Sequence, residues 1–317
     1  MGKIAFIFPG QGSQTVGMGQ QLAQRYANVA TVFERADQTL NTELSSLIFN
    51  GPKETLTLTV NAQPALLTTS IAILEKFKEA NIKPDFVAGH SLGEYTALVA
   101  ANAIAFEDAV FAVRKRGELM EEAVPAGKGT MAAILGMESE DLLKITNQIT
   151  SEGNPVQLAN LNCPGQIVIS GSTEGVQLAS AMAKENGAKR AIPLEVSGPF
   201  HSSLMQPAAE KFTEVLNHIK IQDATIPVIS NVTAMPITRA DEIKTKLIEQ
   251  LYSPVLWQGI VTTLLDSGVD TFIEIGPGKV LSGLVKKVNR RITTYSISDE
   301  ESLLSTIESI KGETQNA

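Results

Sequence analysis

The stretch Gly89-His90-Ser91-Leu92-Gly93 places a serine between two glycines at two-residue spacing. Residues 83–88 before it predict a short buried strand, and residues 94–100 after it predict a helix. A strand, a Gly-x-Ser-x-Gly turn and a helix in this order are typical of a nucleophile elbow, whose sharp turn exposes the serine hydroxyl. The stretch therefore predicts an α/β protein with Ser91 as an acyl-transfer nucleophile. The alternative is a loop that carries the same pattern without catalysis.

The composition suits a globular protein. The chain has 317 residues, of which 43% are hydrophobic, enough for one large or two modest domains. A formal net charge of -8 disfavours nucleic acid as a partner. The single cysteine, Cys163, excludes an internal disulfide and favours a reducing, cytoplasmic location.

Membrane and metal functions are not expected. No stretch is apolar for long enough to span a membrane, and the first apolar run, residues 4–8, ends at Pro9-Gly10 too early for a signal peptide. It predicts a buried strand instead. The three histidines, His90, His201 and His218, belong to no ligand cluster, so no metal is expected.

The order of predicted elements divides the chain. Residues 130–135, 156–161, 166–170 and 191–196 predict strands, and residues 139–150 and 173–186 predict helices. The resulting β-α-β-β-α-β order is typical of a ferredoxin-like unit. We therefore expect a ferredoxin-like small domain over 127–197, inserted in an α/β domain that comprises 1–126 and 198–317. No nucleotide cofactor is expected, because Thr15 occupies the last glycine position of a dinucleotide motif that would begin at Gly10.

A serine nucleophile needs a base. His90 adjoins the nucleophile, where the elbow points neighbouring side chains apart, and His218 lies at a predicted helix end. His201 lies in a loop, Ser197-Gly198-Pro199-Phe200-His201, where the chain returns to the large domain. Because catalytic residues concentrate on such loops, His201 is the preferred base. The alternative is a histidine that caps the following helix.

Two more groups suit acyl transfer. The backbone N–H of Leu92 follows the nucleophile, and the Gly10-Gln11-Gly12 loop could supply a second donor to an oxyanion. That loop could equally be an ordinary strand-to-helix turn. Arg116 lies on the flank of the apolar stripe of a helix predicted over 106–124, where a partly buried guanidinium needs an anion. A structural ion pair with a carboxylate is the alternative.

Seven segments together resemble one family, the malonyl-CoA:acyl carrier protein transacylases. They run from residue 8 to residue 278. They are Phe8-Pro9-Gly10-Gln11-Gly12-Ser13-Gln14, Gly89-His90-Ser91-Leu92-Gly93-Glu94-Tyr95, Arg116-Gly117, Asn162-Cys163-Pro164-Gly165-Gln166, Gly198-Pro199-Phe200-His201, Gln250-Leu251-Tyr252-Ser253-Pro254-Val255-Leu256-Trp257 and Glu274-Ile275-Gly276-Pro277-Gly278.

The resemblance implies roles for residues of this sequence. Ser91 would be the nucleophile and His201 its base, oriented by the backbone carbonyl of Gln250 rather than by a carboxylate. Gln11 and Leu92 would supply the oxyanion donors from their backbones, and Arg116 would bind the malonyl carboxylate. The implied fold is an α/β-hydrolase-like large domain with a ferredoxin-like insertion.

The implied reaction is a ping-pong transfer from malonyl-CoA to the phosphopantetheine thiol of acyl carrier protein, with no metal or redox cofactor. Malonyl-CoA and acyl carrier protein are the expected partners, and a monomer is expected. Carrier proteins of this kind are acidic, so a net negative chain needs a local basic patch. Lys189-Arg190, Lys286-Lys287 and Arg290-Arg291 are the densest basic groups. Solvated helix charges are the alternative.

Overall fold

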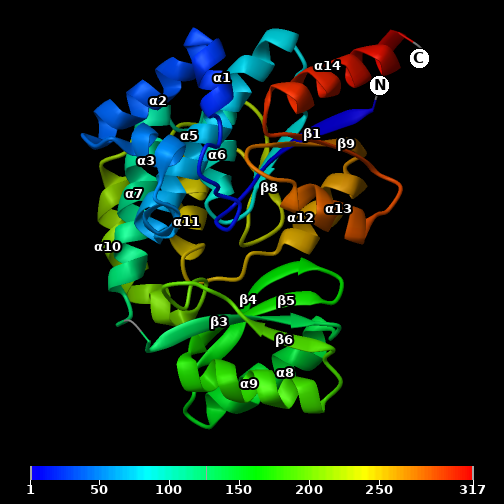
Figure 1. Ribbon diagram of the computed structural model, residues 1–317. Helices are drawn as coiled ribbons and strands as arrows, with labels where there is room; N and C mark the ends of the chain where they lie inside the picture. Colours follow the sequence, from blue (N-terminus) through cyan, green and yellow to red (C-terminus); the bar gives the residue numbers. More distant parts are fainter. Residues whose placement is uncertain (1, 126, 316–317) are drawn as a thin grey trace.

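The structure, a computed structural model, describes residues 2–125 and 127–315. Its larger sheet has six strands in the order β10-β9-β1-β2-β7-β8 (Figure 1). Neighbouring strands are parallel except β7 and β8. The strands are β1 (Lys3–Phe8), β2 (Phe86–Gly89), β7 (Val228–Ile229), β8 (Pro236–Ile237), β9 (Val269–Ile275) and β10 (Thr293–Ile297).

Helices cover both faces of this sheet. Ile4, Phe6 and Phe8 of β1 belong to one apolar core and Ala5 and Ile7 to another, because successive strand residues point to opposite faces. The helices of this part of the chain, including two 3₁₀ turns, are α1 (Gln20–Arg25), α2 (Ala27–Leu40), α3 (Leu44–Asn50), α4 (Lys53–Thr57), α5 (Thr59–Phe77), η1 (Lys78–Ala80), α6 (Gly93–Ala100), α7 (Phe106–Glu122), η2 (Ser203–Met205), α10 (Gln206–Asn217), α11 (Ala240–Glu249), α12 (Trp257–Asp266), α13 (Val280–Val288) and α14 (Glu300–Gln315).

The smaller sheet is antiparallel, with strand order β4-β5-β3-β6. Its strands are β3 (Gly129–Leu135), β4 (Val156–Cys163), β5 (Gln166–Ser172) and β6 (Arg190–Pro193). Helices α8 (Ser139–Ser151) and α9 (Thr173–Glu185) pack on the face turned away from the larger sheet, over a core of their own (Figure 1). The predicted fold class is confirmed, including the β-α-β-β-α-β order. The division after residues 126 and 197 stays a prediction, and residue 126 lies outside the described residues.

Two strands are shorter than predicted. The strand predicted over 83–88 begins only at Phe86, and the strand predicted over 191–196 ends at Pro193. Leu194 still donates its backbone N–H to the Met131 carbonyl of β3 at 3.0 Å, and residues 194–196 then line a cavity. The sequence analysis did not predict β10 and α14. All but one residue of β10 are only half-buried, because it is an edge strand, so its apolar pattern is weak.

Candidate active site

Ser91 lies in the sharp turn between β2 and α6. Its φ of 51° is in the left-handed region, which residues other than glycine rarely adopt. A Cβ added to Gly89 would lie 1.9 Å from the backbone of Gly93, and one added to Gly93 would lie 2.2 Å from the carbonyl oxygen of Phe8. Both glycines are therefore required by close backbone packing, which is the geometry of the predicted elbow.

Asn231 holds this turn in place. Its Oδ1 accepts a hydrogen bond from the backbone N–H of Ser91 at 2.7 Å, and its Nδ2 donates to the carbonyl of Gly89 at 2.7 Å. The side chain is fully buried, so these bonds are not weakened by exchange with water. Asn231 thus offsets the strain of a left-handed serine. It lies 140 residues from Ser91, and the sequence analysis missed it.

His201 contacts the serine directly. Its Nε2 lies 2.7 Å from Ser91 Oγ, and its Nδ1 lies 2.8 Å from the backbone carbonyl oxygen of Gln250. A carbonyl can only accept, so Nδ1 carries the proton and Nε2 is free to accept one from the hydroxyl. The other two histidines do not bond the serine hydroxyl: His90 lines the same cavity but bonds Asn162 through Nε2, and His218 is exposed at the end of α10.

Arg116 of α7 lies next to Ser91. Its position on the flank of the apolar stripe indicated partial burial, but only 1% of the residue's surface is exposed. Its Nη1 donates to Gln63 Oε1 at 2.8 Å. Its Nη2 donates to Gln250 Oε1 at 2.9 Å and to Ser91 Oγ at 3.1 Å. Within the described ranges no carboxylate forms a direct ion pair with Arg116, so the alternative of a structural ion pair is wrong. The guanidinium is held by two neutral amides.

The two predicted oxyanion donors face the same cavity as Ser91. Gln11 and Leu92 both line it, and neither backbone N–H donates a hydrogen bond to another described residue. The Gln11 side chain is anchored separately, because its Nε2 donates to Thr59 Oγ1 at 3.1 Å, and Thr59 Oγ1 in turn lies 3.0 Å from Ser197 Oγ. Two free N–H groups beside a serine hydroxyl are what an oxyanion needs.

The cavity that holds these groups has a volume of about 290 Å³. Residues of the small sheet and of the segment after it form its second wall. Two regions of the chain, one on each sheet, thus enclose the serine. The lining residues are Gln11, Gly12, Gln14, Thr57, His90, Ser91, Leu92, Arg116, Met120, Met131, Asn160, Leu194, Glu195, Val196, Phe200 and His201.

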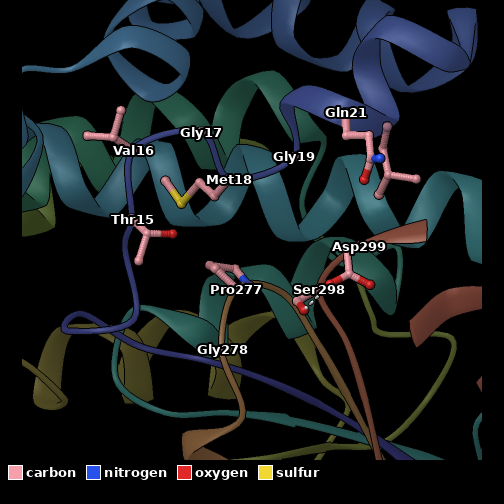
Figure 2. A pocket seen from close by; sticks show the side chains of 11 residues that line it. Thr15, Val16, Gly17, Met18, Gly19, Gln21, Pro277, Gly278, Ser298 and Asp299 are labelled. Carbon is pink, nitrogen blue, oxygen red and sulfur yellow. Dashed lines mark hydrogen bonds between the residues drawn. The ribbon is translucent and has the colours of Figure 1, made fainter. Parts of the chain in front are cut away.

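A second cavity, also of about 290 Å³, lies beside the chain segment that follows Gln14 (Figure 2). Thr15, Gly17 and Gly19 form one side of it, and Pro277 and Asp299 lie on the other. Its lining contains no histidine, cysteine, lysine or arginine, and its one carboxylate accepts hydrogen bonds from Ser302 at the start of α14. Its one hydroxyl beside a carboxylate, Ser298, makes only a long hydrogen bond of 3.4 Å to Asp299 and has no histidine near it in the lining, so the cavity at Ser91 is the candidate active site.

Burial keeps His201 uncharged. Desolvation, together with the nearby positive charge of Arg116, lowers the pKa of His201 to about 3, against a smaller opposing effect of the Gln250 carbonyl. The imidazole is therefore neutral at neutral pH, which is the state that can accept the hydroxyl proton.

This pKa predicts the pH profile. A base whose pKa is lowered stays deprotonated as the pH falls through 6.5 and gains its proton only near the lower value. We expect kcat/KM to persist down to about pH 5 without the inflection near 6.5 of an ordinary histidine. Steady-state rates between pH 4 and 9 would measure this, and a loss of activity as the pH falls through 6.5 would contradict the buried, neutral histidine.

In the part of the chain that the structure describes, no three His, Cys, Asp or Glu side chains are grouped so that they could hold a metal ion. Among those residues, no helix is both long and apolar enough to cross a membrane.

Comparison with known proteins defines the class. The family model of the acyl transferase domain matches residues 5–307, so the chain belongs to the acyl transferase family. It is 66% identical, over the whole of both chains, to the malonyl CoA-acyl carrier protein transacylase of Bacillus subtilis (strain 168).

Solved structures give the same class. The malonyl CoA-acyl carrier protein transacylase of Clostridium perfringens superposes with a TM-score of 0.95 at 43% identity, covering 98% of each chain. A malonyl-transacylase solved in complex with its type II PKS acyl-carrier protein superposes with a TM-score of 0.94 at 41% identity, covering 97% of this chain and 99% of the other.

The polar residues that surround the predicted ones were not predicted from the sequence. Gln63, Glu94 and Asn231 are each completely buried, and the side chain of Gln250 bonds Arg116 in addition to the predicted role of its carbonyl. One signal was available: Gln63 is a polar residue inside the apolar run of α5. A buried polar side chain needs a polar partner, and that partner is Arg116.

Proposed function

We propose that this protein transfers a malonyl group from malonyl-CoA to the phosphopantetheine thiol of an acyl carrier protein, through an ester on Ser91. The observation that carries the proposal is the contact of one hydroxyl with both a neutral base and a buried cation. His201 Nε2 lies 2.7 Å and Arg116 Nη2 3.1 Å from Ser91 Oγ. The names of the relatives support the choice of substrates.

In the first half-reaction Ser91 Oγ attacks the thioester carbonyl carbon while His201 Nε2 takes the hydroxyl proton. The backbone N–H groups of Gln11 and Leu92 stabilise the oxyanion. Its collapse breaks the C–S bond, and His201 returns the proton to the departing sulfur of CoA. In the second half-reaction the carrier thiol gives its proton to His201 and attacks the ester, and Ser91 Oγ leaves with that proton.

Labelling tests this proposal against a thioesterase. Incubation with malonyl-CoA that is radioactive in the malonyl group should place the label on Ser91, and added carrier protein should then take it up. A thioesterase would instead pass the acyl group to water. Rapid release of free malonate without carrier would therefore overturn the proposal.

Arg116 is the proposed ligand of the malonyl carboxylate, which acetyl-CoA lacks. In Arg116→Ala the carboxylate would be buried without a partner, so kcat/KM for malonyl-CoA should fall by about 2–3 kcal/mol in transition-state stabilisation, roughly 30–150-fold. Transfer of acetyl should hold or rise. Arg116→Lys should recover part of the loss, because lysine offers one point charge instead of a planar fork.

The measurement for Arg116 is the ratio of kcat/KM for malonyl-CoA to that for acetyl-CoA in each variant. A ratio in Arg116→Ala equal to the wild-type ratio would mean that the arginine only supports Gln63 and Gln250. Any loss of kcat/KM that comes from disturbed packing in the variant affects both substrates, so it cancels in the ratio.

A basic surface is the proposed docking site for the acidic carrier protein. Lys189 packs on Gly136, whose N–H donates to the Gly165 carbonyl at 2.7 Å, and the adjacent Gln166 accepts a hydrogen bond from Lys287 at 2.8 Å. The basic pairs Lys189-Arg190 and Lys286-Lys287 thus share one end of the small sheet, and all four side chains are exposed.

Charge reversal tests the docking surface. Lys286→Glu with Lys287→Glu should raise the KM for carrier protein several-fold at low salt, because long-range attraction is lost, and spare the KM for malonyl-CoA. The matched control reverses Lys53 in α4 and Lys220 in the loop after α10, both of which are exposed. An unchanged carrier KM, or an equal effect in the control, would exclude this surface.

The proposed chemistry requires no metal or redox cofactor, so dialysis against a chelator should leave the rate unchanged. We also propose that the enzyme works as a cytoplasmic monomer. Sedimentation at micromolar concentration would test the monomer.

A further inference from the structure

The carboxylate of Glu94 is buried near Arg116, and the proposed reaction does not use it. Glu94 is the second residue of α6, three positions after the nucleophile, and none of its surface is exposed. Its Oε2 accepts hydrogen bonds from Gln250 Nε2 at 2.6 Å and from the backbone N–H of Asn231 at 3.3 Å. Its Oε1 has no hydrogen-bond partner among the described residues.

The side chain of Gln250 connects this carboxylate to the guanidinium. Gln250 Oε1 accepts from Arg116 Nη2 at 2.9 Å, and Gln250 Nε2 donates to Glu94 and to the Ser91 carbonyl. Because a guanidinium only donates and a carboxylate only accepts, the orientation of the amide is determined. One amide therefore separates a buried positive charge from a buried carboxylate.

We propose that Glu94 is the counter-charge of Arg116 in the empty enzyme and that it takes up a proton when the substrate carboxylate docks on Arg116. This inference rests on the proposed malonyl specificity. It adds a titrating side chain that touches neither the substrate nor the Ser91 hydroxyl and acts through Arg116.

Charge balance supplies the reason. In the empty site one guanidinium and one carboxylate compensate each other, and a buried charge without compensation is costly. The malonyl carboxylate adds a second negative charge to the same enclosed region. The other titratable groups nearby do not balance it: His201 is neutral, and the Tyr95 phenol, against which the guanidinium lies at 5.6 Å from the ring centre, bears no positive charge. Protonation of Glu94 at its unpartnered Oε1 restores neutrality.

The ionisation of Glu94 is poised for this exchange. Burial raises the pKa of Glu94 to about 7, and the hydrogen bonds of Gln250 and Asn231 and the charge of Arg116 only partly oppose it. A further negative charge nearby raises the pKa again. Above pH 7 the carboxylate is therefore ionised in the empty enzyme and protonated in the malonyl complex. Below pH 6 it is protonated in both.

Calorimetry measures the proton directly. Malonyl-CoA is titrated into the Ser91→Ala enzyme, which cannot react, at pH 8 in two buffers of different ionisation enthalpy. We expect uptake of about one proton per site at pH 8 and almost none at pH 5.5. Acetyl-CoA should take up none at either pH. The two ligands share the CoA moiety, so its own ionisations cancel.

Glu94→Gln in the same Ser91→Ala enzyme is the matched variant, because the amide keeps the shape and still accepts from Gln250. The uptake should disappear. In the enzyme with Ser91 intact, the KM for malonyl-CoA should rise towards tenfold per pH unit above pH 7, and in Glu94→Gln it should stay flat. If Glu94 contributed only to packing, its replacement by glutamine would not change how the KM for malonyl-CoA depends on pH.

The outcomes separate this inference from the proposed function. Equal uptake with malonyl-CoA and acetyl-CoA, or the same uptake with and without the Glu94 carboxyl, would overturn the inference while leaving malonyl transfer intact. If Glu94→Gln does not fold, the comparison of the two ligands in the Ser91→Ala enzyme still decides. Absence of any malonyl adduct on the reactive enzyme would instead contradict the proposed function.

Discussion

Replacing Ser91 with alanine is expected to abolish the covalent malonyl adduct and to lower transfer to carrier protein by at least about 10⁴-fold, because no other described side chain places a nucleophilic oxygen beside His201 Nε2. The measurement is retention of radioactive malonyl on the protein after denaturation, together with the transfer rate. A hydroxylamine-sensitive malonyl adduct on the Ser91→Ala protein would mean that the nucleophile is misassigned.

Two further variants separate chemistry from folding at this position. Ser91→Gly should be more stable than Ser91→Ala by about 1 kcal/mol, because glycine adopts the φ of 51° without strain. Ser91→Cys keeps a nucleophile, so it should still form an adduct. Thermal unfolding of both proteins would show whether loss of activity tracks loss of the hydroxyl rather than loss of the fold.

Replacing His201 with alanine is expected to lower the rate by on the order of 10²–10⁴, the usual range for removing a general base. The remaining rate comes from the free N–H groups of Gln11 and Leu92 and from substrate binding, which the substitution leaves in place. Pre-steady-state labelling of Ser91 is the measurement, because it isolates the step in which the hydroxyl loses its proton.

His218→Ala is the control for His201→Ala. His218 is exposed at the end of α10 and should give a rate near that of the unchanged enzyme. The double variant Ser91→Ala with His201→Ala should be no slower than Ser91→Ala alone, since residues that act as a unit are not additive. A large loss in His218→Ala with little loss in His201→Ala would reverse the assignment of the base.

The local part of the site could be predicted because it depends on neighbours in the chain. The elbow needs small residues two positions on each side of Ser91, because Gly89 and Gly93 approach each other closely across the turn. The contact of Gly93 with Phe8 is different, because Phe8 belongs to β1, which is distant in the sequence and comes close only in the folded sheet. The alternating burial of β1 follows from its own apolar run. The order of strands and helices over residues 129–193 likewise predicted the ferredoxin-like unit.

The pairing of distant residues could be predicted only by resemblance. Nothing in the residues around His201 distinguishes a base from a helix cap. Its role depends on Ser91, 110 positions away, and on a carbonyl at Gln250 that the chain brings close through α11. Resemblance implied these contacts, and the structure places the atoms at 2.7 and 2.8 Å.

Residues that are close together in the chain carry the features that could be predicted: a serine in an elbow, a two-part α/β fold, and an arginine on a helix beside an apolar stripe. The environment of those groups depends on the packing of distant elements. It buries Arg116 almost completely, gives it Gln63 and Gln250 as partners, and sets Glu94 one amide away. Burial and charge compensation depend on which elements pack together, so a carboxylate three residues from the nucleophile shows its titrating role only in the folded chain.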